Sequence, residues 1–275
     1  MKAAIVYLHA ITPVHSGTGQ TVAVIDLPIA REKATGWPII PGSSIKGVVR
    51  ATSTGDETAK EAAFGSQEKA GEIVLTDQRI LCLPVRSFFG TFAWVTCPLV
   101  LGRFAKDMKA IGAAPPFTVG TPSVANQDAC KVCPGSTLVN GNKVYLEDLD
   151  LNPSEDAAAT MPIADGIAGA LFANDQQGPT PFTKRFAVVS DELFSFLSET
   201  ATEVAARIAL NERGTTTGDG GNLWYEEAVP SETIFAGAAL HANGGDPKTV
   251  LNGISYVQIG GNASVGRGLC RVIVG

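Results

Sequence analysis

The sequence has no long hydrophobic run. Near the N-terminus the longest apolar stretch extends from Ala3 to Leu8, which is too short for the core of a signal peptide or for a membrane span. Hydrophobic residues nevertheless make up 45% of the 275 residues, enough for the core of one large or two small domains. We therefore expect a globular, cytoplasmic protein with no membrane partner.

Cysteine is scarce, and its number is odd. The chain has five cysteines, at positions 82, 97, 130, 133 and 270. An odd number without a signal peptide argues against a disulfide framework. Cys130 and Cys133 form a lone CxxC pair, whereas a structural zinc site needs two more ligands at defined spacing, and the nearest histidine is His241. We favour reduced thiols, with a zinc or redox site as the alternative.

Basic residues are fewer than acidic ones. The chain has 21 Lys and Arg against 27 Asp and Glu, a net charge of −6 that by itself speaks against binding to nucleic acid. The charges are segregated along the chain, however. Residues 12–50 and 74–110 are basic, whereas residues 147–232 are strongly acidic. This pattern predicts one face that binds an anion and another that repels it.

Short strands mixed with helices indicate an α+β fold. Residues 2–11 read as a strand, and a helix begins with Ser43 or Ser44 as its N-cap. We expect further strands at 73–75, 80–85, 143–149, 254–259 and 269–274, and helical stretches at 58–64, 91–108, 163–172 and 191–199. Loop-rich insertions are expected at about 109–142 and 152–183. Residues 204–210 and 232–240 are expected to pair as a projecting hairpin with its tip at 213–222.

Lys46 stands in the first turn of the expected helix, where the helix dipole disfavours a cation. A nearby anion would reverse that preference. Free backbone amides, the hydroxyls of Ser43 and Ser44 and the Lys46 ammonium would together form a phosphate-binding arrangement. The alternative is an exposed lysine on a frayed turn.

A glycine-rich loop connects the last two expected strands. It contains Gly260, Gly261, Gly266 and Gly268 together with Arg267. The loop lacks the Gly-Lys-Ser/Thr ending of a P-loop and is followed by a strand, so it matches neither a P-loop nor a dinucleotide fingerprint. Its glycines allow the backbone to pack against an extended ligand. A plain hairpin loop is the alternative.

Two residues of the first loops are weak candidates when taken alone. His15 lies in the glycine-containing stretch "TPVHSGTG", where it either touches a phosphate or base or is simply solvated. Asp26 is isolated, and an ordinary aspartate is a poor general base at neutral pH. Its carboxylate could instead hold Mg²⁺, because hard cations prefer oxygen ligands.

The ordered combination of motifs resembles a known family. "TPVHSGTG", "VIDLPIARE", "GWPIIPGSSIKGVVR", "LPVRSFFGTFAWVTCP", "LWYEEAVPSETIF" and "GGNASVGRG" follow one another from end to end. The chain is similar to the RAMP superfamily of CRISPR proteins and, more closely, to the backbone subunit of the type III-B (Cmr) RNA-targeting complex. The resemblance implies one RAMP domain over residues 1–275. Its core would be ferredoxin-like and RRM-related, with a projecting thumb hairpin within about 204–240.

The resemblance also implies a function. In the family, copies of the subunit stack as a filament along a guide CRISPR RNA beside other Cmr subunits, and complementary target RNA is cut at regular intervals. Asp26 matches the aspartate that target cleavage requires, and cleavage there needs Mg²⁺ or Mn²⁺ and proceeds by attack of the RNA 2′-hydroxyl. By the same resemblance His15 lies near the RNA, and Ser43, Ser44 and Lys46 match a guide-backbone contact. Arg50 and the glycine loop with Arg267 complete the expected RNA-binding set.

The sequence supports an endoribonuclease that is active within the assembled complex, but three alternatives stay open. The subunit could be a scaffold that binds the guide RNA without cutting, or the backbone subunit of another type III subtype. A metabolic α+β enzyme that uses the glycine loop for a small ligand is the third. The acidic segment 147–232 is expected to face away from RNA or toward a neighbouring subunit.

Overall fold

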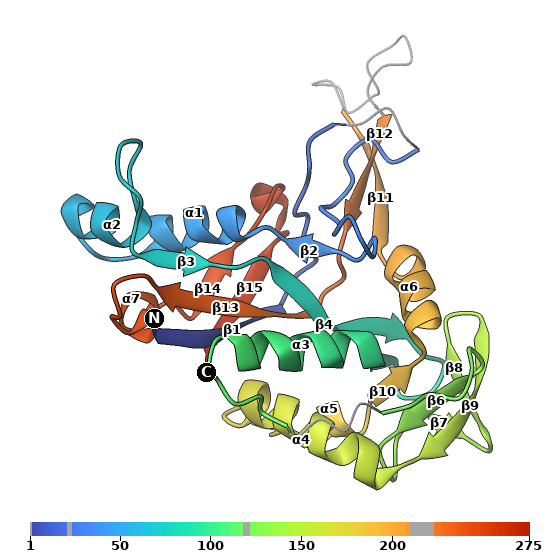
Figure 1. Cartoon of the computed structure of the whole chain (residues 1–275). Helices are drawn as coiled ribbons and strands as arrows, with labels where there is room; N and C mark the ends of the chain where they lie inside the picture. Colours follow the sequence, from blue (N-terminus) through green and yellow to red (C-terminus); the bar gives the residue numbers. More distant parts are fainter. Residues whose placement is uncertain (1, 21–23, 118–121, 210–222) are drawn as a thin grey trace.

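A computed structural model describes residues 2–20, 24–117, 122–209 and 223–275 (Figure 1). Within these residues one mixed sheet of thirteen strands forms the body of the molecule, in the order β14-β15-β1-β13-β4-β5-β10-β6-β9-β8-β7, with β2 and β3 as short side pairings. A separate hairpin, β11–β12, projects from it (Figure 1). No helix in the described residues is long and apolar enough to cross a membrane.

Four strands at the centre of the sheet form the ferredoxin-like core. They are β1 (Lys2–Ala10), β4 (Gln78–Arg86), β13 (Ile234–His241) and β15 (Leu269–Val274). They lie in the order β15-β1-β13-β4, and each neighbouring pair is antiparallel. Helix α1 (Gly42–Thr52) lies in the connection from β1 to β4, and α7 (Pro247–Leu251) lies in the connection from β13 to β15. This interleaving of two βαβ units is the ferredoxin-like topology, so the predicted fold class is confirmed.

Strand β1 is buried from Ala4 to Ala10 because helices and loops cover both faces of the sheet. Tyr7 packs with its ring centroid 6.2 Å from that of Phe104 in α3 (Pro98–Ala110). His9 meets Phe172 of α4 (Ala157–Phe172) edge-on at 5.3 Å. A strand covered on both faces reads as a continuous apolar run, and this explains the stretch from Ala3 to Leu8.

The long segment between β4 and β13 extends the sheet. Its strands are β5 (Phe92–Thr96), β6 (Ala129–Val132), β7 (Val139–Asn140), β8 (Lys143–Leu146), β9 (Leu149–Glu155) and β10 (Phe186–Val189). Three expectations about this segment are corrected. Residues 91–108 are a strand followed by a helix, because Pro98 begins α3 after a run of aromatic and β-branched residues. The expected insertion 109–142 contains β6 and β7. Half of the expected insertion 152–183 is the helix α4, which starts six residues earlier than predicted.

The projecting hairpin was predicted with the wrong second strand. β11 (Glu203–Ile208) pairs with β12 (Leu223–Ala228), and not with residues 232–240. Residues 234–241 instead form β13 at the centre of the sheet, between β1 and β4. The expected tip, residues 213–222, lies outside the described residues.

The start of α1 is held by a distant acid. Pro41 occupies the N-cap position without a side-chain cap, so Ser43 and Ser44 lie inside the helix and neither is its cap. The amide of Gly42 donates to Asp77 Oδ1 at 2.8 Å, from the connection between β3 (Ile73–Leu75) and β4. A carboxylate at a helix N-terminus satisfies an otherwise unpaired N–H group and complements the helix dipole.

The remaining elements are short or peripheral. Helix α2 (Glu57–Phe64) follows α1 and is capped by Asp56, whose carboxylate accepts from Ala59. The others are β2 (Ile39–Ile40), α5 (Thr180–Thr183), α6 (Asp191–Thr200) and β14 (Tyr256–Gln258). All five cysteines are buried and free, and burial raises the pKa of the Cys130 thiol to about 12 and also raises that of Cys133. A thiol held protonated is a poor nucleophile and metal ligand, which supports the interpretation as reduced thiols.

Removal of the Asp77 carboxylate should destabilise α1. We expect Asp77→Ala to lower stability by about 1 kcal/mol and the melting temperature by about 2 °C, because the Gly42 amide loses its acceptor. Asp77→Asn keeps an acceptor oxygen and should lose less. Thermal unfolding followed by circular dichroism measures both, with the fully exposed Asp148→Ala as control. Equal melting temperatures for Asp77→Ala and the control would contradict this role.

Candidate active site and nucleic-acid interface

Three segments far apart in the sequence meet at the base of the β11–β12 hairpin (Figure 1). The first loop pairs with β12 and the residue after it, through the bridges Val14↔Val229 and Leu27↔Glu226. It also folds back on itself at Gly17↔Ile29. The glycine loop, residues 260–268, packs against the start of the same loop. The motifs around residues 15, 26, 226 and 262 are thereby brought into one region.

Asp26 is anchored to β12. Its Oδ2 accepts a hydrogen bond from the Tyr225 amide at 2.8 Å, and the next residue, Leu27, donates its own amide to the Tyr225 carbonyl at 3.0 Å. Asp26 is half-buried, so part of its side chain remains open to solvent. One carboxylate oxygen therefore fixes the orientation of the group at the hairpin base.

His15 is buried between the hairpin and the glycine loop. It is 7% exposed, and its Nδ1 lies 2.6 Å from the Glu227 carbonyl oxygen. Its own carbonyl accepts from the Gly261 amide at 3.0 Å. A Cβ on Gly260 would lie 2.1 Å from that carbonyl oxygen, and Gly260 has a φ of 80°. The glycine thus serves a close approach between two segments of this chain.

The rest of the glycine loop is also tied to its surroundings. Gly268 donates to the Pro13 carbonyl at 2.8 Å, and Gly266 ends a turn of 3₁₀ helix over Ala263–Val265. Arg267 points inward, with its side chain 11% exposed and Nη1 3.6 Å from Glu203 Oε2 of β11. Burial raises the pKa of Glu203, and the Arg267 charge offsets only part of that shift. Arg267 therefore braces the hairpin.

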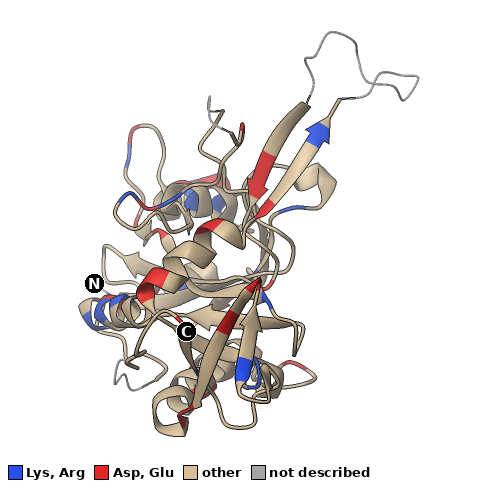
Figure 2. Ribbon diagram, turned by 90° about the vertical axis from the view of Figure 1, so that its right-hand side faces the viewer, with Lys and Arg blue, Asp and Glu red and all other residues tan. Residues whose placement is uncertain are grey.

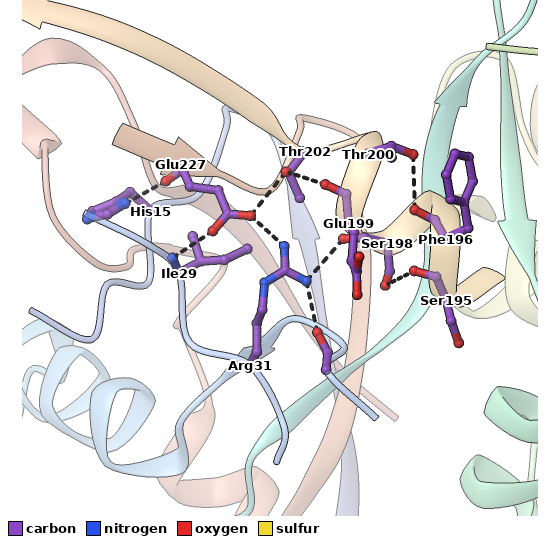
Figure 3. A network of polar contacts seen from close by, with 11 residues as sticks. His15, Ile29, Arg31, Ser195, Phe196, Ser198, Glu199, Thr200, Thr202 and Glu227 are labelled. Carbon is purple, nitrogen blue, oxygen red and sulfur yellow. Dashed lines mark hydrogen bonds and ion pairs between the residues drawn. The ribbon is translucent and has the colours of Figure 1, made fainter. Parts of the chain in front are cut away.

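Two acids that the sequence analysis passed over organise this region. Glu227 is 3% exposed, and its carboxylate binds groups of the first loop and of the connection between α6 and β11 (Figure 3). Its Oε2 accepts from the Ile29 amide at 3.1 Å, and its Oε1 accepts from Thr202 at 3.1 Å and forms an ion pair with Arg31. Arg31 also donates to the Ser198 carbonyl at 3.1 Å.

Glu226 faces the opposite side of β12 and binds the glycine loop. Its carboxylate accepts from Trp224 Nε1 at 2.8 Å, from Arg207 Nε at 3.1 Å and from Asn262 Nδ2 at 3.0 Å. Burial acts to raise the pKa of Glu226, but the hydrogen bonds from Trp224 and Arg207 outweigh it and hold the pKa below its usual range. Acids mark both strands of the hairpin near its base (Figure 2). These acids, part of the acidic segment 147–232, thus lie beside the candidate site. That the segment faces away from RNA or toward a neighbouring subunit stays a prediction.

The residues predicted to contact the guide lie on α1, apart from the hairpin base (Figure 1). Ser43 is exposed, and Ser44 and Lys46 are half-buried. Arg50 is engaged within the chain, because it donates to the Gly65 carbonyl at 2.8 Å and forms an ion pair with Glu57. The predicted set therefore separates into an α1 group and a hairpin-base group.

The basic segment 74–110 is largely neutralised by neighbouring acids. Arg103 forms an ion pair with Glu32, and Arg79 lies 2.9 Å from Asp107. The exposed Arg86 lies 3.3 Å from Glu147. In the part of the chain that the structure describes, no group of three His, Cys, Asp or Glu residues could hold a metal ion. A metal ion at Asp26 would therefore need further ligands other than the His, Cys, Asp and Glu side chains of the described residues.

Comparison with known proteins identifies the family of this chain. The family model for the RAMP superfamily matches residues 7–271. The chain belongs to the RAMP superfamily. It is 36% identical to the CRISPR system Cmr endoribonuclease Cmr4 of Pyrococcus furiosus, in an alignment that covers 99% of this chain and 95% of that protein. It is 22% identical to the CRISPR system CMR subunit Cmr4 of Saccharolobus solfataricus over 97% of this chain and 94% of that protein.

Solved structures agree on the RAMP fold. Oligomeric Cmr4 from Pyrococcus furiosus superimposes with a TM-score of 0.78 at 32% identity, covering 100% of this chain and 98% of that one. A chain of the type III-B Cmr-beta complex bound to cognate target RNA gives a TM-score of 0.75 at 18% identity, covering 100% and 97%. The resemblance to the RAMP superfamily and to its type III-B subunit is thus confirmed.

Removal of the Glu227 carboxylate should loosen the hairpin base. We expect Glu227→Ala to cost about 3 kcal/mol, because Arg31 and the Ile29 amide lose a buried partner. Glu227→Gln keeps an acceptor and should cost less. Urea denaturation measures both, and the exposed Glu68→Ala should stay within about 0.5 kcal/mol of the wild type. A loss below about 1 kcal/mol for Glu227→Ala would contradict this organising role.

The Glu32–Arg103 pair should make stability depend on acid pH. The Arg103 hydrogen bond lowers the pKa of Glu32 from 4.5 to about 2. Because the folded-state pKa is depressed, this stabilisation is present above pH 4.5 and is lost as the pH falls toward 2. Urea denaturation of wild type and Glu32→Gln across this range should show a stability difference that shrinks with falling pH. A difference that does not vary with pH would contradict the assignment.

Proposed function

We propose that this chain is the guide-RNA-binding filament subunit of a type III-B (Cmr) CRISPR effector complex and cleaves complementary target RNA within that complex. The observation that carries the proposal is the position of Asp26, held by β12 at the base of the projecting hairpin. The relative named as an endoribonuclease, similar over nearly the whole chain, supports it. The partners implied are the guide CRISPR RNA, the target RNA, further copies of this chain and other Cmr subunits.

The proposed chemistry needs no nucleophile from the protein. The 2′-oxygen of the target RNA attacks the adjacent phosphorus, a new P–O2′ bond forms and the P–O5′ bond breaks. The 2′-hydroxyl loses its proton and the departing 5′-oxygen gains one, which leaves a 2′,3′-cyclic phosphate and a 5′-hydroxyl. The protein's task is to align the 2′-oxygen in line with the leaving oxygen, an effect that supplies a large part of a rate enhancement.

Asp26 is suited to hold groups in position. One oxygen is fixed by the Tyr225 amide, so the other is presented in a defined direction. The half-buried carboxylate can accept a hydrogen bond from a ribose hydroxyl or from a water molecule. The hairpin beside it would hold the target strand, while His15 is braced against the Glu227 carbonyl behind it.

A divalent cation at Asp26 would have to be bound jointly by this carboxylate and by the RNA. Mg²⁺ usually keeps several waters and binds one or two carboxylates together with substrate phosphates, which matches a single acid. Asp26 is the residue that would hold Mg²⁺ or Mn²⁺, with RNA phosphates completing the site. The ion would supply charge stabilisation at the phosphate.

A scaffold that binds the guide without cutting is the second candidate. The hydrogen bond from Tyr225 to Asp26 favours it, because this bond also gives the carboxylate a purely structural use. The two candidates differ in what happens when the carboxylate is removed from an assembled complex.

Asp26 variants in the assembled complex separate these candidates. With guide RNA, complementary target and Mg²⁺, we expect Asp26→Ala and Asp26→Asn to lower the cleavage rate by about 100-fold or more. Target binding should be unchanged. Asp148→Ala replaces a fully exposed acid elsewhere and should cleave at the wild-type rate. If both Asp26 variants cleave at the wild-type rate, Asp26 is not catalytic, and the scaffold function is the candidate that stands.

A further inference from the structure

A second polar surface lies away from the hairpin base, in a groove between α1 and the loop that joins α2 to β3. Ser43 and Lys46 of α1 form one wall, and Ser66 and Lys69 of the loop form the other. Phe64, Ile73 and Leu75 lie along its floor. The loop projects from the same side of the sheet as the hairpin (Figure 1).

The groove has the charge of an anion site. Its two charged lining residues are Lys46 and Lys69, and no carboxylate is among the residues that line it. Within the described residues neither lysine forms an ion pair, whereas Arg31, Arg50, Arg79 and Arg103 are paired with acids. Two unpaired ammonium groups facing one groove in a chain of net charge −6 favour a bound anion.

The loop is built to hold one shape. The Ser66 amide donates to the Lys69 carbonyl at 2.9 Å, and Gly65 bridges to Ala70. A Cβ on Gly65 would lie 2.7 Å from the Gly71 nitrogen, and a Cβ on Gly71 would lie 2.3 Å from the Phe64 carbonyl carbon. The two glycines let the ends of the loop cross at close distance, which fixes the direction in which Lys69 leaves the turn.

Arg50 ties this loop to α1. It donates to the Gly65 carbonyl at 2.8 Å and forms an ion pair with Glu57 at the start of α2. These contacts occupy both terminal nitrogens of the guanidinium. The arrangement gives Arg50 a different part from the direct RNA contact expected from the sequence.

We propose that this groove binds the phosphate backbone of the guide RNA. Lys46 and Lys69 bind the phosphates from opposite walls of the groove. Arg50 positions the loop 65–71 without contacting the RNA. The inference rests on the proposed guide-binding function and adds to it a second wall, made by residues 65–71. The hydroxyls of Ser43 and Ser66 line the same groove and can donate to phosphate oxygens. Because the contacts go to the backbone, this binding should not depend on the base sequence.

RNA binding by the full-length chain tests the groove. Affinity for a single-stranded RNA oligonucleotide is measured at several KCl concentrations. Lys69→Ala should lower affinity about three- to tenfold and reduce the slope of log K against log salt by about 0.7, the value for one lost phosphate contact on a single strand. Lys69→Arg should retain binding. Lys248→Ala replaces an exposed lysine on α7 and should bind like the wild type.

A double-mutant cycle tests the role of Arg50. If Arg50 acts through the loop, Arg50→Ala should weaken RNA binding in the wild-type background but add no loss in the Lys69→Ala background. Losses that multiply would mean that Arg50 contacts RNA itself, which would overturn the positioning role. Thermal unfolding of each variant identifies any loss of folded protein.

The failures of the two proposals are distinguishable. If the wild type and Lys69→Ala bind RNA equally while Lys46→Ala binds more weakly, the groove proposal is wrong and guide binding stands. If the wild-type chain binds no RNA, both proposals are wrong. Loss of cleavage in Asp26→Ala with unchanged RNA affinity bears on the catalytic assignment alone.

Discussion

The backbone pairing between the first loop and strand β12 is the interaction on which the site depends. The Glu227 amide donates to the Leu27 carbonyl at 3.0 Å, while Val14 and Val229 exchange hydrogen bonds at 2.8 and 2.9 Å. These contacts join two separate points of the long connection between β1 and β2 to the base of the hairpin. Asp26 and His15 take their positions from this pairing and from no helix or strand of their own.

Two adjacent buried acids make that pairing rigid. Side chains of neighbouring residues on a strand point to opposite faces, so Glu226 and Glu227 reach different partners. Glu226 takes hydrogen bonds from the hairpin and the glycine loop, and Glu227 takes them from the first loop and from Thr202, just after α6. A buried carboxylate without donors is costly, so the fold holds these donors in place and thereby holds the loops.

An acidic chain can bind RNA if its charges are distributed locally. Most arginines near the candidate surfaces are paired with acids and act as braces between segments, as Arg31 does between Glu227 and α6. Lys46 and Lys69, by contrast, form no ion pair within the described residues and line the same groove. Net charge therefore says little about this protein, whereas the pairing of individual side chains says a great deal.

The order of motifs was sufficient to predict the family and the ferredoxin-like core, because spaced strands, turns and helices follow the family from end to end. Local secondary-structure propensity gave wrong predictions where contacts with distant segments determine the structure. Residues 232–240 look like an edge strand of a hairpin, yet β13 occupies the centre of the sheet between β1 and β4. Helix α4 has Pro162 within it, and a proline is usually found at a helix start or break, so the first six residues of the helix were not predicted.

The sequence alone was enough to name the candidate RNA-binding groups: a lone Asp26, a glycine loop and cations on a helix. Which contacts these groups make within the protein became visible only in the folded chain. Asp77 caps a helix 35 residues away in the sequence, Glu226 and Glu227 became the organisers of the hairpin base, and Arg50 became a brace. Such roles depend on contacts between distant segments, and local propensity contains no information about which distant donor a buried acid will meet.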